Sequence, residues 1–518
     1  MPMKRLLILA LVLLFGTLVP IASADDITNT QGFRKAVTVE AIRQHQAALQ
    51  SIASASGGNR LAGMPGHDAS AQYVYDQAVA AGYDVRFQEF QFLLVADRTA
   101  PILQQVSPVA QTYINGVDFG TLTYSGSGDV TAPLTAVDLI VPSPQDNAST
   151  SGCEAADFAG FPAGSIALLQ RGTCTFRIKA TNAAAAGAVG VIVFNEGNPT
   201  RSGLLGGTLN APLFHLPVVG TTFALGNTLR NGVLNGPTGV QVRLRTDTIA
   251  ENRMTRNVIA ETPGGDPNRV IVIGAHLDSV SRGPGINDNG SGSAAILEVA
   301  KMFAQHERET RNKLRFIWFT AEELGLIGST YYVNNLSQAE RAKIQLNLNF
   351  DMIGSPNFVR FVYDGNNSAF APPNAQRGPA GSGAIEQVFL DYFASQGLAV
   401  APTPFNGRSD YGPFITNGIP AGGLFTGAEG IKSAAQAAVY GGTAGQQFDP
   451  CYHLACDTFD NNSNTALDQM SDAVAHAVLS FSKRNFDREP LVDPALVPDS
   501  GSGGGGGLHD DHDHDAEM

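Results

Sequence analysis

The sequence predicts an α/β protein with a second domain of short strands, and three observations lead to this prediction. The chain has 518 residues, more than one ordinary domain contains, which suggests two or three domains. From about residue 257 onward, long helical patterns alternate with buried apolar strands, as in a parallel sheet. Between residues 111 and 246 the apolar runs are shorter and rich in β-branched residues. Hydrophobic residues make up 43% and charged residues 15%, so the chain can bury a large core.

Residues 1–24 have the features of a secretory signal peptide. Lys4 and Arg5 give a positive start, Leu6 to Val19 is almost entirely apolar, and residues 22–24 (Ala-Ser-Ala) are small, as cleavage requires. The apolar run is shorter than the about 20 residues of a spanning helix, and an uncleaved anchor is the alternative. We expect a secreted protein, extracellular or periplasmic, with no membrane span after cleavage.

The segments that follow alternate between helix, strand and loop. Residues 25–36 are expected to be a flexible lead, and residues 37–110 the first part of the main domain. Helical spacing predicts helices over 37–56 and 68–81, followed by a strand over 84–92. Within 111–246 we expect strands over 139–141, 166–169, 189–194 and 212–219, and a helix over 180–186.

The main domain is expected to continue over residues 247–486 and to end before a polar tail. Residues 487–518 contain Gly503 to Gly507 and then a tip rich in His and Asp, a composition that forms no core. We therefore expect a disordered tail. Its His residues could hold a metal ion loosely, and a simple solvated tail is the alternative.

The net charge and the cysteine content indicate which partners and which cross-links to expect. The 33 Lys+Arg and 47 Asp+Glu residues give a net charge of −14, which argues against a nucleic-acid partner. The four cysteines follow a secretion signal and so suggest two disulfides. Pairing of near neighbours, Cys153 with Cys174 and Cys451 with Cys456, is one of three possible connectivities.

Three predicted strands of the main domain end in histidine or acidic side chains. These are His276 and Asp278, then Glu322 and Glu323, then Asp351. Ligands of parallel α/β sheets bind beyond the carboxyl ends of the strands, so these side chains are expected to converge. Each residue alone has a simpler explanation, because acids at a helix start often only complement the helix dipole.

Two more residues complete a candidate metal site. Asp288 lies in the Gly-rich loop 285–292, and His453 lies between Cys451 and Cys456. A catalytic zinc ion takes three protein ligands, so two zinc ions fit if one carboxylate bridges them. The proposed ligands are His276, Asp288, Glu323, Asp351 and His453. Glu322 is then left as a general base. No HExxH helix and no GxSxG motif occurs, which argues against the common single-zinc proteases and serine hydrolases.

Several segments together resemble the M28 family of two-zinc aminopeptidases. They are GAHLDS (274–279), GINDNGSG (285–292), FTAEELGLIGS (319–329), NFDMIG (349–354), GRSDYGPF (407–414), CYHLACD (451–457) and GNRLAGMPGHDASAQYV (58–74). Residues 111–246 resemble an α+β protease-associated (PA) domain inserted into that peptidase. The resemblance implies a mixed, largely parallel central sheet flanked by helices, and a disulfide between Cys153 and Cys174.

The resemblance also implies a role for each site residue. His276 and Asp351 would hold one zinc ion, Glu323 and His453 the other, with Asp288 as the bridge. Glu322 would be the general base for attack on the first peptide bond.

Three further residues complete the implied site. Tyr452 would donate to the oxyanion, and Arg408 would help hold the substrate near its free amine. Asp278, two residues from His276 on a strand, would accept a hydrogen bond from its imidazole. Peptides and proteins with a free N-terminus, preferably apolar and Leu-like, are the implied substrates.

Other functions of the same fold stay as alternatives. Some relatives lose the metal ligands and act as receptors, and others are carboxypeptidases or one-zinc glutaminyl cyclases. Calcium at Asp468 and Asp472, one helical turn apart, is a further possibility implied by some secreted relatives, and a solvated helix face is the alternative. We expect a monomer.

Overall fold

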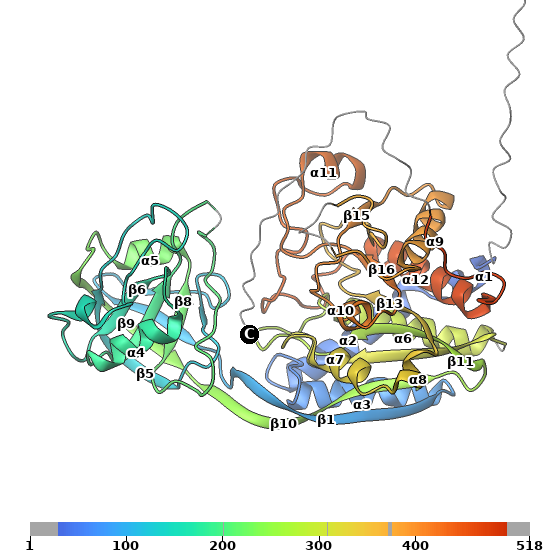
Figure 1. Ribbon diagram of the computed structural model, residues 1–518, viewed down its shortest axis with the longest axis horizontal. Helices are drawn as coiled ribbons and strands as arrows, with labels where there is room; N and C mark the ends of the chain where they lie inside the picture. The colour runs from blue at the N-terminus through green and yellow to red at the C-terminus, as the bar shows by residue number, and fades with distance from the viewer. Residues whose placement is uncertain (1–28, 200, 308, 371–375, 495–518) are drawn as a thin grey trace, which may run out of the picture.

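The computed structural model describes residues 29–494, except residues 200, 308 and 371–375. They form two lobes joined by two long strands, β1 (Asp84–Asp97) and β10 (Thr248–Glu261) (Figure 1). These strands pair antiparallel along their whole length. The chain therefore leaves the larger lobe and returns to it at one place. The expected signal peptide and the His- and Asp-rich tip lie outside the described residues.

The larger lobe is built on an eight-stranded sheet in the order β1-β10-β12-β11-β13-β16-β14-β15. The central strands β12, β11, β13 and β16 are parallel, whereas β1, β10 and β14 join the sheet antiparallel. This is the mixed, largely parallel sheet that was expected. The remaining bounds are β11 (Asp266–His276), β12 (Asn312–Phe319), β13 (Ile344–Phe350), β14 (Phe361–Tyr363), β15 (Ala401–Thr403) and β16 (Ala421–Phe425).

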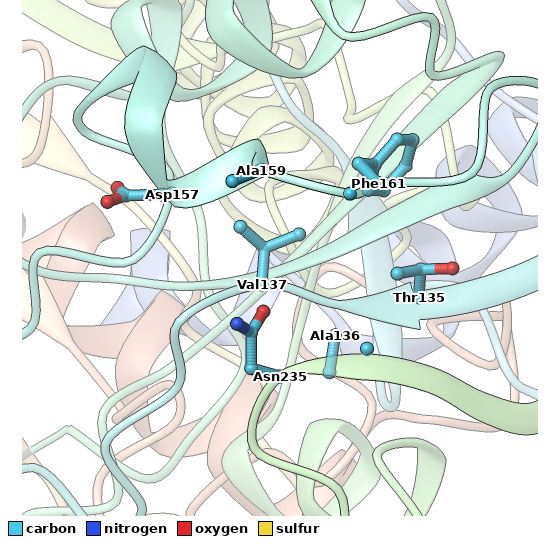
Figure 2. Close-up of a pocket in the computed structure, with 9 residues that line it drawn as sticks. Thr135, Ala136, Val137, Asp157, Ala159, Phe161 and Asn235 are labelled. Atoms are coloured by element: carbon cyan, nitrogen blue, oxygen red, sulfur yellow. The ribbon is translucent and has the colours of Figure 1, made fainter.

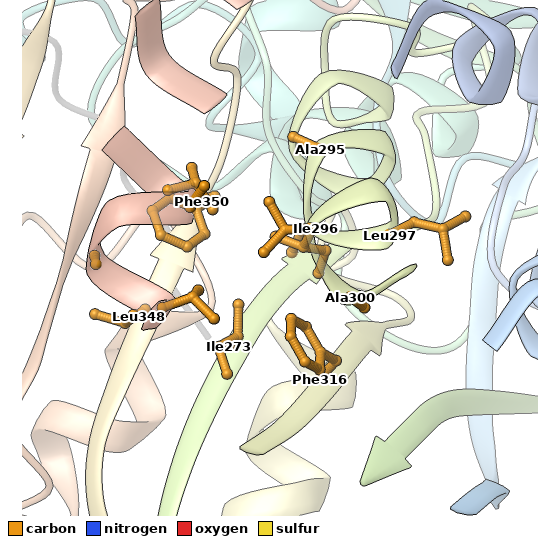
Figure 3. Packing of buried hydrophobic residues seen from close by; sticks show 14 of the residues in the cluster. Ile273, Ala295, Ile296, Leu297, Ala300, Phe316, Leu348 and Phe350 are labelled. Carbon is orange, nitrogen blue, oxygen red and sulfur yellow. The ribbon is translucent and has the colours of Figure 1, made fainter. Parts of the chain in front are cut away.

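Helices cover both faces of this sheet, as the alternation along β11 shows. Ile271 and Ile273 pack in the large core under α6, whereas Val270 and Val272 pack in a second cluster with residues of α7 and α10. Figure 3 shows Ile273 beside Ile296 of α6 in the large core. The helices of this lobe are α1 (Gln31–Ala36), α2 (Val39–Ala55), α3 (Pro65–Ala80), α6 (Gly290–His306), α7 (Ile327–Asn334), α8 (Gln338–Arg341), α9 (Ser382–Ser395), α10 (Tyr411–Thr416), α11 (Ala434–Tyr440) and α12 (Asn464–Lys483).

The smaller lobe contains a second eight-stranded sheet with its own core. The strand order is β3-β2-β9-β5-β6-β7-β8-β4, and β5, β6, β7 and β8 are parallel. Apolar side chains from the two faces of this sheet form two separate clusters. The elements are β2 (Ile102–Ser107), β3 (Gln111–Thr112), β4 (Phe119–Thr121), β5 (Gly128–Ala136), the short 3-10 helix Ala155–Phe158, β6 (Ile166–Gln170), α4 (Phe176–Ala185), β7 (Gly190–Phe194), β8 (Val218–Thr221), α5 (Phe223–Leu229) and β9 (Gly236–Thr246).

Several local predictions were wrong. The expected flexible lead contains helix α1, whose Phe33 is buried in the large core. The second sheet already begins at β2, before the expected boundary at residue 111. Residues 139–141 form no strand, and residues 212–217 lead into β8 as loop. The first part of the expected tail is ordered, because Asp493 accepts hydrogen bonds from the backbone of Gly381 and Gly383.

Two disulfides join the cysteines that are close in sequence. Cys153 pairs with Cys174 and Cys451 with Cys456, with Cα–Cα distances of 5.7 and 5.3 Å. The first lies in the smaller lobe, and the second closes the loop that carries Tyr452 and His453. Within the described part of the chain, no helix combines the length and apolarity that a membrane crossing needs.

Candidate metal centre

Histidine and acidic side chains converge at the carboxyl ends of three neighbouring parallel strands. His276 is the last residue of β11, Glu322 and Glu323 follow β12, and Asp351 follows β13. Because β11 lies between β12 and β13, His276 stands in the middle of the group. All of these side chains are buried or nearly so. The strand ends therefore come together as the sequence predicts.

Asp288 joins the cluster to a second histidine. One carboxylate oxygen, Oδ1, lies 3.2 Å from Nε2 of His276, and the other, Oδ2, lies 3.1 Å from Nε2 of His453. His276 Nε2 is also 3.2 Å from Asp351 Oδ1, and His453 Nε2 is 3.0 Å from Glu323 Oε2. The arrangement is two groups of three residues that share Asp288. The five residues expected to bind metal are thus brought together.

The chemistry of this group fits bound cations. Several carboxylates are buried within reach of two imidazoles, and one oxygen of Glu323 is buried without a hydrogen-bond partner. The potential ligand atoms of His276, Asp288 and Glu323 lie within 4.8 Å of one another, and so do those of His276, Glu322 and Asp351. Buried like charges at such separations are unfavourable unless a positive charge lies between them.

The neighbouring carboxylates raise the proton affinity of both histidines. Burial would lower the pKa of His276, but Asp351 and Glu322 raise it well above the ordinary value. Burial would also lower the pKa of His453, but the carboxylates of Glu323 and Asp288 outweigh this effect and raise the pKa to about 10. Metal ions and protons therefore compete for the same imidazole nitrogens.

Glu322 lies beside the cluster rather than between its two halves. Its Oε2 is 3.9 Å from His276 Nε2, farther than the carboxylates of Asp288 and Asp351. Burial raises the pKa of Glu322 well above its usual value, and the nearby Asp351 and Asp410 add to this. A carboxylate with a raised pKa next to such a site has the proton affinity that a general base requires.

The carboxylate of Asp278 accepts hydrogen bonds from the backbone of the two glutamates and lies farther from the imidazole of His276. Its carboxylate accepts the backbone N–H groups of Glu322 at 3.1 Å and Glu323 at 3.4 Å. Oδ1 is 3.7 Å from Nδ1 of His276, beyond hydrogen-bond range, whereas the backbone carbonyl of Asp278 lies 3.3 Å from that nitrogen. The imidazole is therefore oriented by the Asp278 carbonyl, a detail that the sequence pattern does not reveal.

The Tyr452 hydroxyl lies in a short chain of polar contacts. Arg408 donates one N–H to it at 3.1 Å and another to Glu429 at 2.7 Å. The Tyr452 ring stacks on His453, with ring centroids 3.8 Å apart. Because the phenol oxygen already accepts from Arg408, its own proton is free to donate. Burial would raise the pKa of Glu429, but the pairing with Arg408 lowers it. Glu429 was not predicted from the sequence.

A buried cluster of two carboxylates and one side-chain amide connects two loops of the metal centre. Asn461 donates its amide to Asp449 at 2.9 Å and to Asp457 at 3.1 Å. Asp457 accepts the backbone N–H groups of Asn287 and Asp288, at 2.8 and 3.0 Å. Asp449 accepts the backbone N–H that begins the disulfide-closed loop. This cluster therefore joins the Asp288 loop to the His453 loop, and nothing in the sequence spacing indicated it.

Arg60, in the segment before the smaller lobe, is a second residue that the prediction missed. Its guanidinium is fully buried and donates to the backbone carbonyls of Leu277, Pro284 and Gly285. These carbonyls belong to the loop between His276 and Asp288. Arg60 thus fixes that loop and places a positive charge behind the acidic cluster.

Unusual backbone conformations also gather at the centre. Ala321, Met352 and His453 have positive φ values of 55°, 50° and 57° although none is glycine. They lie directly before Glu322, directly after Asp351 and at a proposed ligand. Such conformations are costly and are found mainly where the position of a side chain matters for function.

The acidic pair on α12 and a cavity in the smaller lobe lie outside the metal centre. Asp472 pairs with Arg34 of α1 at 2.9 Å, so a guanidinium already neutralises half of the pair expected to bind calcium, and calcium there stays a prediction. A cavity of about 230 Å³ in the smaller lobe is lined by Thr135, Val137, Phe161 and neighbouring residues (Figure 2). Asp157 is its one charged lining residue.

Comparisons with known proteins agree with this geometry. Residues 257–478 match peptidase family M28, and residues 130–229 match the PA domain. An aminopeptidase of Pseudomonas aeruginosa is 49% identical over 446 residues, which is 85% of this chain and 81% of that protein. Leucine aminopeptidase 2 of Arthroderma otae is 40% identical over 478 residues, or 91% of this chain and 89% of that protein.

Solved structures give the same result. An aminopeptidase from Aneurinibacillus sp. strain AM-1 superimposes with a TM-score of 0.60 at 27% identity, covering 90% of this chain and 98% of that one. The family match covers the lobe that holds the strand-end acids and histidines, and the PA match lies inside the smaller lobe. The chain therefore belongs to peptidase family M28 and carries a PA domain within its peptidase domain.

Proposed function

We propose that the protein is a secreted two-zinc aminopeptidase that removes N-terminal residues, preferably apolar and Leu-like ones, from peptides and proteins. The observation that carries this proposal is the shared position of Asp288, whose two oxygens face two different histidine–carboxylate pairs. One zinc ion would be held by His276, Asp288 and Asp351, and the other by Asp288, Glu323 and His453. This ligand set corresponds to three protein ligands for each ion.

Two zinc ions bound there supply the positive charge that acidifies a water molecule and polarises the substrate carbonyl. Glu322 accepts the proton of the attacking water and returns it to the leaving amine, because its raised proton affinity suits both steps. The Tyr452 hydroxyl donates to the oxygen on which negative charge develops. Arg408 donates an N–H to the oxygen of the Tyr452 hydroxyl and thereby orients that hydroxyl.

The free amine of the substrate is positively charged, and the buried carboxylates of Glu322 and Asp351 offer it a complementary environment. Arg408 pairs with Glu429, so its charge is balanced and repels the ammonium less. The preference for Leu-like residues is supported by the printed names of relatives such as leucine aminopeptidase 2. Secretion is supported by the leader at residues 1–24 and by two disulfides. A monomeric state belongs to the same proposal, whereas calcium at Asp468 and Asp472 stays an alternative to a solvated helix face.

The test combines metal analysis with one variant. Glu322→Gln keeps the shape of the side chain and removes its basicity, so the zinc-to-protein ratio should stay at two while turnover of leucine nitroanilide falls by about 10²–10⁴. Zinc content measures the first property and initial rates the second. Near-normal turnover would remove Glu322 from this role.

A separate comparison tests which end of the peptide is cleaved. Peptides blocked at the C-terminus should be cleaved, whereas peptides blocked at the N-terminus should not. The opposite pattern would indicate a carboxypeptidase on the same fold, and loss of ammonia from N-terminal glutamine would indicate a cyclase.

A further inference from the structure

One turn of the smaller lobe lies against the metal-centre loop. This turn, residues 114–119, leads into β4 of the PA domain. A Cβ atom placed on Gly116 would lie 3.0 Å from Leu454 Cδ2 and 3.2 Å from Arg282 Cδ. Leu454 follows His453 directly and lies in the disulfide-closed loop. A residue of the inserted domain thus lies so close to the neighbour of a proposed zinc ligand that no side chain fits between them without a shift.

Leu454 is enclosed by glycines from both lobes. On the other side, a Cβ atom on Gly283 would lie 2.2 Å from the backbone oxygen of Leu454. Gly283 is absent from the residues with positive φ, so the lack of a side chain there is required by this contact and not by the backbone angle. The loop therefore sits in a narrow gap between the peptidase lobe and the turn of the PA domain.

The turn itself is rigid enough to act as a support. The Gly116 N–H donates to the carbonyl of Phe119 at 2.7 Å, and the carboxylate of Asp118 accepts the N–H of Ile114 at 2.8 Å. Phe119 is fully buried in the core of the PA domain. Movement of the PA domain would therefore move Gly116 with it.

Arg282 extends the same contact toward the metal centre. Its side chain packs under Gly116, and its charge interacts with Glu323, with the Tyr452 hydroxyl and with Asp97 at the end of β1. Asp97 is the last residue before the chain leaves toward the PA domain, and one of its oxygens is buried without a hydrogen-bond partner. The cation thus lies where the two lobes meet the acidic cluster.

We propose that the PA domain is part of the catalytic machinery: its turn at Gly116 seats on Leu454 and Arg282 and holds the loop that carries Tyr452 and His453 in position. Gly116 and Leu454 are positioning residues that act through this loop. The inference rests on the proposed two-zinc function, since it assigns the loop its catalytic task. It gives the inserted domain a role that does not require it to bind substrate.

The experiment compares two asparagine substitutions in the PA domain. Gly116 and Gly232 have φ angles of +84° and +81°, but a Cβ atom on Gly232 meets nothing within 4 Å. Asparagine tolerates this backbone region better than most residues, so Gly116→Asn and Gly232→Asn differ mainly in the contacts with Leu454 and Arg282. The double variant Gly116→Asn/Leu454→Ala restores space at the contact, and Leu454→Ala alone completes the cycle.

Three readouts are expected to change in Gly116→Asn and not in Gly232→Asn. Amide exchange of residues 451–457 should become faster, one of two zinc ions should be lost at lower chelator concentration, and kcat should fall by about tenfold or more. Thermal unfolding should show that both variants are folded. The double variant should recover part of each loss.

Equal behaviour of the two asparagine variants in all three readouts would overturn the proposal. So would a loss in Gly116→Asn that the Leu454→Ala substitution does not relieve. Wild-type protein without zinc and without aminopeptidase activity would instead refute the proposed function. The exchange measurement would still report whether the turn supports the loop.

Discussion

Asn461 shows how one neutral side chain allows two buried acids to coexist. Its amide bridges Asp449 and Asp457, and burial together with Asp449 raises the pKa of Asp457 to about 8. Asn461→Asp removes the two donors and adds a third carboxyl group. At pH 5 protonated carboxyls can still donate hydrogen bonds, whereas at pH 9 they cannot. The variant should therefore lose little stability at pH 5 and about 1–3 kcal/mol or more at pH 9.

Thermal unfolding at the two pH values measures this difference. Asn464→Asp adds the same charge at an exposed position of α12 and serves as the control. An equal loss of stability at pH 5 and pH 9 for Asn461→Asp would contradict the explanation. Zinc retention should follow stability, because Asp457 holds the backbone of Asp288.

At this scale the sequence predicted the residues with distinctive chemistry and missed those that support them. His276, Glu323 and Asp351 could be predicted because each follows a recognisable buried strand. Arg60 could not, because it donates to a backbone carbonyl 224 residues away in the sequence. Asn461 could not, because it donates to the carboxylates of Asp449 and Asp457, which only the folded chain brings together. Neither periodicity nor residue type indicates such contacts.

Among the elements, α9 carries a carboxyl group with an unusual proton affinity. Burial, with Asp364 close by, raises the pKa of Glu386 to about 7, while its Oε2 accepts the N–H of Gly365 at 3.0 Å. Between about pH 4.5 and 7 the folded protein holds a proton here that the unfolded chain releases. Folding is therefore favoured less as the pH rises through this range.

Glu386→Gln should remove this dependence, because the amide accepts the same hydrogen bond without a charge. We expect a higher Tm than wild type at pH 8 and an equal Tm near pH 4.5. Asp391→Asn, on the exposed side of the same helix, should show no such trend. A Tm difference that does not depend on pH would be evidence against this account of Glu386.

The elements that the sequence predicted well are the long ones. The strands that end at His276 and Asp351 and the helix near residues 37–56 combine many apolar residues with a clear period. Helix α1 has only six residues, too few for a period to appear, and its position depends on packing against α12. The apolar residues 139–141 are loop, and only Leu139 among them is buried, whereas Ile140 is 41% exposed, so an apolar run here does not mark a buried strand.

The whole molecule has two lobes with separate cores, and metal should stabilise only one of them. Proposed ligands lie in the peptidase lobe, whereas the clusters of the PA domain contain no part of the site. Calorimetry should show two transitions, and chelation should lower the Tm of only one. Zinc should restore it and calcium should not. A chelator that shifts both transitions equally, or neither, would contradict this division.

The insertion between the paired strands β1 and β10 also sets the order in which the two lobes can be completed during synthesis. Strands β2 to β9 are contiguous in sequence, so the inserted lobe can fold as soon as it emerges from the ribosome. The peptidase sheet needs β1 from before the insertion and strands β10 to β16 from after it, and His453 is translated later still. The larger lobe can consequently complete its sheet and its metal centre only after nearly the whole chain has been translated.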